Sequence, residues 1–161
     1  MLTLDIQRAT GAASPGDGPL RRAAEQALAV AAVGERDWEL SLRLVDCAEM
    51  QDLNRRYRDR DRSTNVLSFP AQLPADVDVP LLGDVVICAP LVQREAANQH
   101  KTPAAHWGHL LIHGVLHLLG FDHERSADAR RMEAMERQAL AALGWPDPYA
   151  RRAAPPARAP V

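Results

Sequence analysis

The strongest constraint on the fold is an apolar segment that contains regularly spaced histidines. The stretch HGVLHLLGFDH, residues 113–123, places three imidazoles among leucine and valine residues that proteins normally bury. In a helix, His109 and His117 lie about 40° on either side of His113, and His106 lies about 20° away. The other faces of such a helix are apolar. The pattern therefore predicts a buried helix with one polar stripe.

The spacing of the histidines also predicts a metal site. Uncharged imidazoles in an apolar interior each need a polar partner, and residues at i and i+4 place two ring nitrogens within reach of one ion. Gly120 allows the chain to leave the helix, so that His123 can supply a third ring. We therefore expect His113, His117 and His123 to bind one metal ion.

The ligand set favours Zn²⁺ over Mg²⁺ or Ca²⁺, which prefer oxygen ligands, although Ni²⁺, Cu²⁺ and Fe²⁺ remain compatible. Three protein ligands leave a fourth position open to water or substrate, as in catalytic zinc sites. His109 is one residue that could close that position. Asp122 either orients a ligand histidine or acts as a turn residue, and His106 and His109 are either neighbours of the site or core residues.

The spacing H-x-x-x-H-x-x-G-x-x-H also occurs in the metzincin proteases, which use a glutamate directly after the first histidine as the base. Here Gly114 occupies that position. Glycine inside a helix costs about 1 kcal/mol relative to alanine, so Gly114 predicts a close approach of backbone or ligand. We expect a metzincin-like metal-binding helix and turn that lacks the protease base.

A second feature is an arginine-rich segment. Residues 55–62 hold five arginines and two aspartates, a local net charge of +3 on a chain whose net charge is −2. Most of these arginines fit a solvated helix end, but such a patch also suits phosphate binding. Asn65 and Ser68 either contact a sugar or cap a turn. With only two Phe and two Tyr, extensive base stacking and strong sequence preference are not expected.

The remaining periodicity predicts an α+β domain over residues 1–149, with a small mixed sheet of about four strands covered by five to six helices. Asp46 and Glu49 have the spacing of a capping box, and Gly34 is the expected stop of the first helix. The expected strands are 2–8, 38–45, 65–70 and 85–88, and the expected helices are 19–33, 47–57, 90–100, 103–119 and 127–143.

Composition sets further limits. Residues 150–161 are rich in Arg, Pro and Ala and are expected to form a disordered tail. No secretion signal or membrane-spanning run is evident, and Cys47 and Cys88 each stand alone, so we expect reduced thiols in a cytoplasmic protein. The small net charge gives no general attraction to nucleic acid or membranes.

HGVLHLLGFDH resembles the signature of the YbeY family of bacterial ribosomal-RNA maturation endoribonucleases. LNRRYRDRDRSTNVLSFP (53–70) is similar to the second block of that family, and LLGDVVIC (81–88) to the third. The run from Met132 through Glu136 to Gly144, followed by residues 147–149, resembles its C-terminal helix and stop. The similarity covers roughly residues 37–149.

The resemblance implies a single-strand-specific endoribonuclease that acts in 16S rRNA 3′-end maturation and ribosome quality control. It also implies zinc on the three histidines and an essential arginine in the pair Tyr57–Arg58. The implied partners are single-stranded rRNA, the small ribosomal subunit and assembly factors such as an Era-type GTPase. Ser63 departs from the family, which commonly has proline before Thr-Asn.

Two other functions remain open at this stage. A ribosome-assembly factor with a purely structural zinc predicts that His117→Ala unfolds the protein and that RNA is not cut. A metalloprotease is disfavoured by Gly114. For the nuclease, the attacking group is either water or the 2′-hydroxyl of the RNA, and no residue stands out as a general base.

Overall fold

The computed structural model describes residues 1–150, and within them it contains four strands and five helices, as predicted. In chain order these elements are β1 (Leu2–Ala9), α1 (Asp17–Val30), β2 (Trp38–Val45), α2 (Cys47–Arg58), β3 (Val66–Pro70), β4 (Leu81–Cys88), α3 (Ala89–Asn98), α4 (Pro103–Leu118) and α5 (Ser126–Ala142). The predicted tail falls, apart from Ala150, outside the described residues.

The four strands form one mixed sheet in the order β1-β2-β4-β3. β1, β2 and β4 are parallel, and β3 runs antiparallel to β4. Parallel neighbours need a long crossover connection, and α1 provides it between β1 and β2. The sheet therefore brings β3 and β4 together at the edge furthest from β1.

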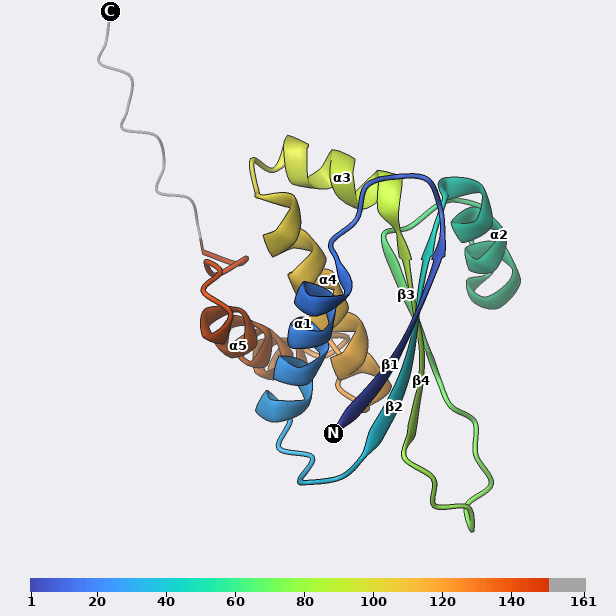
Figure 1. The fold of residues 1–161 in the computed structure, drawn as a ribbon, viewed down its shortest axis with the longest axis vertical. Coiled ribbons are helices and arrows are strands. Elements are labelled where there is room, and N and C mark those ends of the chain that lie inside the picture. Colours follow the sequence, from blue (N-terminus) through green and yellow to red (C-terminus); the bar gives the residue numbers. More distant parts are fainter. Residues whose placement is uncertain (151–161) are drawn as a thin grey trace, which may run out of the picture.

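Helices cover both faces of this sheet (Figure 1). On one face, α1, α4 and α5 pack over Leu42, Val85 and Ile87, which are all fully buried. On the other face lies α2, with Met50 packed near Val86. Val85 and Val86 thus point to opposite faces of the sheet, as successive residues of a β-strand do.

Several predicted boundaries were wrong, in each case because tertiary pairing or local backbone geometry prevailed. β4 begins at Leu81 rather than Val85, since Gly83 and Asp84 also pair with β2. The first helix ends at Val30, before Gly34, and Ala32 adopts a positive φ of 53°. The third helix of the chain ends at Asn98 rather than His100.

The predicted capping box at the start of α2 is not formed. Asp46 is the N-cap residue, but its carboxylate accepts a hydrogen bond from the Thr10 hydroxyl. Glu49 instead forms a bidentate ion pair with Arg43 of β2, with distances of 2.6 and 3.0 Å. The two carboxylates thus join α2 to neighbouring elements of the sheet.

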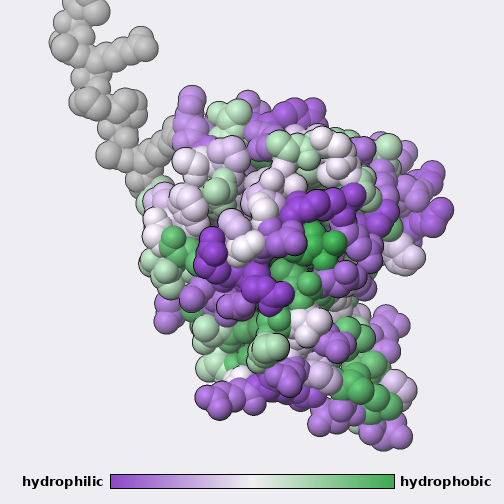
Figure 2. Space-filling view, viewed as in Figure 1, coloured by the Kyte–Doolittle hydropathy of each residue, from purple (hydrophilic) through white to green (hydrophobic). Residues whose placement is uncertain are grey.

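The connection between β3 and β4 exposes several apolar side chains. Leu73, Val77, Val79 and Leu81 are 39–42% exposed, and Figure 2 shows hydrophobic residues at the lower right, where Figure 1 places this connection. This end of the sheet extends beyond the helices. Among residues 1–150, no helix has the length and apolar character needed to cross a membrane.

Candidate metal centre

The structure brings together the three histidines predicted to bind a metal. One ring nitrogen from each of His113, His117 and His123 lies within 4.8 Å of the other two. The first two rings come from the last turns of α4, with centroids 4.6 Å apart, and His123 approaches from the following turn. Gly120 makes this turn possible with a φ of +96°, a conformation that glycine adopts at little energetic cost.

The donor set fits a metal ion. The Nδ1 atom of His113 lies 2.7 Å from a carboxylate oxygen of Glu136 and donates a hydrogen bond to it, so the Nε2 atom keeps a free lone pair. That Nε2 atom lies 3.1 Å from Nε2 of His117. Two nitrogens on one tetrahedral zinc ion are about 3.3 Å apart. The nitrogens of His113 and His117 therefore need little adjustment to share such an ion.

Glu136 is the carboxylate that orients this centre. It is 1% exposed and accepts hydrogen bonds from His113, from the Tyr149 hydroxyl at 2.6 Å and from His109 at 3.3 Å. Burial alone would raise its pKa, but the three hydrogen bonds outweigh burial and lower the pKa of Glu136 to about 2. Glu136 is therefore ionised at neutral pH and acts only as an acceptor, which fixes the tautomer of His113.

The surroundings also keep His117 neutral. Burial and the nearby rings of His113 and His123 lower the pKa of His117 to about 4. A neutral imidazole is the form that binds a metal. Because this ring is uncharged at neutral pH, its nitrogen is available as a ligand without loss of a proton.

The two earlier histidines of α4 lie outside the ligand group. His109 contacts Tyr149 and Glu136, and its ring centroid is 6.5 Å from that of His113. It therefore supports Glu136 rather than closing a fourth metal position. His106 is buried, and its Nε2 atom lies 3.0 Å from Glu95 of α3. Its role is a polar link between two helices.

Asp122 acts as a turn residue rather than by orienting the ring of a ligand histidine. Its carboxylate accepts hydrogen bonds from the backbone N–H groups of His123 and Glu124 at 2.5 and 3.0 Å. These contacts hold the turn that carries His123. Asp122 also exerts an electrostatic effect that raises the pKa of His117, although burial and the neighbouring rings outweigh it.

Gly114 marks a close approach of backbone to the sheet, as predicted. A Cβ atom at this position would lie 2.9 Å from Val85 Cγ1 and 3.2 Å from Ser68 Oγ. The Ser68 hydroxyl donates to the carbonyl of Gly114 at 2.9 Å. Ser68 therefore holds the metal-binding helix against β3, whereas a sugar contact or a turn cap was predicted for it.

Arg58 lies beside the metal centre. Its Nη2 atom donates to the carbonyl of Ser68 at 2.9 Å, and the guanidinium lies 5.8 Å from the Phe69 ring centroid. Arg58 lines a cavity of about 530 Å³ together with His117 and His123. Ser68, which holds α4 through its hydroxyl, thus also holds Arg58 through its carbonyl.

A second cavity continues from Arg58. It measures about 480 Å³, and its lining includes Arg58, Arg60 and Arg62. All three arginines are exposed. We call these two cavities, which share Arg58, the arginine groove. Asn65 also lines it, but its amide donates to Glu95 at 3.1 Å. The arginine groove thus places three arginines next to the metal centre, with the carboxylates of Glu95, Asp122 and Glu124 also in its lining.

Glu136 and Tyr149 belong to the site, and neither was predicted from the sequence to have a role in it. A signal for Glu136 was present, because Met132, Glu136 and Leu140 repeat at the spacing of a buried helix face. A carboxylate at such a position needs polar partners in the interior. Tyr149 follows the last helix and carried no comparable periodic signal.

Comparisons with known proteins agree with this geometry. A family model described as Endoribonuclease YbeY matches residues 16–144. Proteins named Endoribonuclease YbeY from Pseudomonas putida strain KT2440 and Stutzerimonas stutzeri strain A1501 are 58% and 56% identical over 151 residues. These alignments cover 93% of this chain and 94% and 92% of the two relatives.

The fold also matches a solved structure. The solution structure of TM1509 from Thermotoga maritima superposes with a TM-score of 0.57 at 24% identity. The match covers 92% of this chain and 100% of that protein. At this level of identity the likeness supports the arrangement of strands and helices.

Proposed function

Because the chain belongs to the Endoribonuclease YbeY family, we propose that it is a metal-dependent endoribonuclease that cuts single-stranded RNA. The observation that carries the proposal is the position of the three histidines, whose ligand atoms lie within 4.8 Å of one another beside a cavity lined by Arg58. The proposed process is 16S rRNA 3′-end maturation and ribosome quality control.

We propose Zn²⁺ as the ion, held by His113, His117 and His123. Imidazole ligands without a carboxylate suit zinc better than magnesium or calcium. A zinc ion bound by three protein ligands supplies Lewis-acid chemistry at its open position. Glu136 keeps His113 in the tautomer that presents Nε2 to the ion.

Arg58 is the residue proposed to bind the scissile phosphodiester. One of its N–H groups is used by the Ser68 carbonyl, and its other donors remain for phosphate oxygens. A guanidinium held in this way can stabilise negative charge that develops on phosphorus during cleavage. The contact with Ser68 places Arg58 in the same cavity as His117 and His123.

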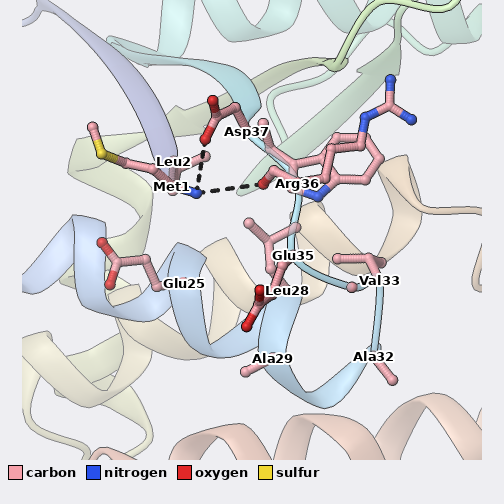
Figure 3. A pocket seen from close by; sticks show the side chains of 12 residues that line it. Met1, Leu2, Glu25, Leu28, Ala29, Ala32, Val33, Glu35, Arg36 and Asp37 are labelled. Carbon is pink, nitrogen blue, oxygen red and sulfur yellow. Dashed lines mark hydrogen bonds and ion pairs between the residues drawn. The ribbon is translucent and has the colours of Figure 1, made fainter.

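The arginine groove is the proposed path of the RNA backbone. Arg60 and Arg62 extend the positive charge away from the metal centre, and phosphate contacts of this kind supply affinity without sequence preference. A larger cavity of about 870 Å³ beside the N-terminus is a poor alternative (Figure 3). Glu25, Glu35 and Asp37 line that cavity together with Arg36 and Met1, and none of the three histidines lines it.

The wider biological setting follows from the family resemblance. We propose that residues 1–149 form one catalytic domain, that the enzyme acts in the cytoplasm, and that its partners are the small ribosomal subunit and an Era-type GTPase. Co-purification with ribosomal particles tests the proposed partners.

The central test combines metal analysis with cleavage of a single-stranded rRNA fragment. His113→Ala should lose both bound metal and cleavage, because it removes a ligand. Arg58→Ala should keep the metal and lose cleavage. Arg55→Ala is the matched control, since Arg55 is paired with Asp52 at 2.5 Å and lies outside the arginine groove. Cleavage by metal-free His113→Ala at the wild-type rate would contradict the proposal.

A further inference from the structure

The two cysteines lie in contact although they are far apart in the chain. Cys47 is the first residue of α2, and Cys88 is the last residue of β4. Their sulfur atoms are 3.3 Å apart, and both thiols are free. We propose that Cys47 and Cys88 form a reversible oxidation site, which a hydroperoxide such as hydrogen peroxide converts to an intramolecular disulfide.

The sheet sets this proximity. Val45 of β2 pairs directly with Cys88 of β4, and Cys47 follows two residues after Val45. Pairing of parallel strands therefore holds the two sulfurs together without any contribution from the metal centre. A disulfide bond is about 2.0 Å long, so small side-chain rotations close the remaining distance.

The environments of the two sulfurs differ in a way that assigns them different roles. Cys47 is half-buried, lies in the first turn of α2 and has the Arg94 guanidinium 3.7 Å from its sulfur. Cys88 is fully buried, and burial raises its pKa. Cys47 is therefore the sulfur that meets the oxidant, and Cys88 is the sulfur that resolves it.

The reaction balances with one peroxide. The Cys47 thiolate attacks one peroxide oxygen, so that an S–O bond forms, the O–O bond breaks and hydroxide leaves, taking up a proton to become water. The Cys88 sulfur then attacks the sulfur of the Cys47 sulfenic acid. An S–S bond forms, the S–O bond breaks, and the released hydroxide leaves as water with the proton of Cys88. Two thiols are oxidised and one peroxide is reduced to two waters.

The disulfide would join the start of α2 to the junction of β4 and α3. These elements meet in the second core, where Met50 and Val86 are buried. The three histidines lie on α4 and its following turn, on the other face of the sheet. Oxidation at Cys47 and Cys88 should therefore stabilise the fold against unfolding while metal binding is retained.

The test treats the reduced, metal-loaded full chain with hydrogen peroxide and follows free thiols, intact mass and labelling by dimedone, which traps sulfenic acids. The wild type should lose both thiols and the mass of two hydrogens, form no disulfide between chains, resist dimedone and recover fully with dithiothreitol. Its oxidised form should melt several degrees higher than its reduced form, because a cross-link restricts the unfolded chain.

Single variants separate the two roles. Cys88→Ser and Cys88→Ala should both be labelled by dimedone, because Cys47 is oxidised but has no resolving partner. Cys47→Ser should keep its remaining thiol, since Cys88 is buried. The proposal is overturned if wild-type protein keeps both thiols when the Cys88 variants are labelled, if it forms cross-linked dimers instead, or if Cys47→Ser is oxidised as fast as the wild type.

Discussion

At the scale of single residues, Glu136 governs the metal centre through His113. Glu136→Gln keeps the size of the side chain but removes the charge that accepts hydrogen bonds from His113 and Tyr149. We expect zinc affinity to fall by about 10–100-fold, the usual effect of losing such an outer partner. Competition with a chromophoric chelator measures the change.

The matched control is Glu133→Gln on the same helix. Glu133 pairs with Arg137 at 3.8 Å near the surface, and its side chain is 35% exposed. Its replacement should leave zinc affinity unchanged. Equal affinities for Glu136→Gln and the wild type would show that the carboxylate does not support the ligand.

His106 makes the stability of the protein depend on pH. Burial lowers the pKa of His106, and the hydrogen bond with Glu95 only partly offsets this effect. The unfolded chain therefore binds a proton at this residue more readily than the folded chain does. The pKa of His106 is therefore lower in the folded chain than in the unfolded chain. The contribution of the neutral His106 ring to the free energy of unfolding is complete above about pH 6.5 and is lost as the pH falls further.

We expect His106→Gln to reduce this acid sensitivity. Urea unfolding of both proteins at several values between about pH 7.5 and pH 5.5 measures the slope of the unfolding free energy. The wild type should lose more stability than the variant across this range. Identical slopes would mean that His106 is protonated to the same extent in the folded and unfolded states.

At the scale of elements, Gly114 determines how closely α4 approaches β4. In Gly114→Ala the new methyl group would lie 2.9 Å from Val85 Cγ1, a branched side chain within a strand that has little room to move. Overpacking costs about 1–3 kcal/mol, and alanine gains about 1 kcal/mol over glycine inside a helix, so we expect the free energy of unfolding to fall by up to about 2 kcal/mol. Urea denaturation of the metal-free proteins isolates this packing effect from metal binding.

Gly108→Ala on the same helix is the control. Its nearest neighbour would be 3.8 Å away, an ordinary contact. Alanine is favoured over glycine inside a helix by about 1 kcal/mol, so this variant should be neutral or more stable. A Gly114→Ala protein as stable as Gly108→Ala would contradict the close approach between helix and strand.

At the scale of the whole molecule, we predict that the core folds without the metal. Leu42, Leu111 and Val85 are fully buried and pack between the sheet and α4. Chelation should therefore leave the far-ultraviolet circular dichroism unchanged and lower the melting temperature. Binding stabilises the fold by about 2.7 kcal/mol when free metal is about 100 times Kd.

His117→Ala should fold without metal and lose this stabilisation. If His117→Ala or the chelated wild type unfolds instead, a structural zinc is favoured over a catalytic one. Circular dichroism combined with differential scanning calorimetry distinguishes the two outcomes.

The predictions made from local patterns were the most accurate. His113 and His117 are one helical turn apart, and Gly120 redirects the chain within a few residues, so the group with His123 depends on short-range geometry. The strand and helix order also followed from periodicity. The predicted boundaries at Val33 and Val85 were wrong, because turn geometry ends α1 at Val30 and pairing with β2 starts β4 at Leu81.

The sequence by itself determined the three-histidine group, the arginine-rich segment and the succession of strands and helices along the chain, because each depends on residues close together in the chain. Only the tertiary structure decided that Glu136 meets His113, that Ser68 holds both Arg58 and Gly114, and that Cys47 touches Cys88. These contacts join distant segments. They depend on strand order and on the packing of α4 and α5, which local periodicity does not encode.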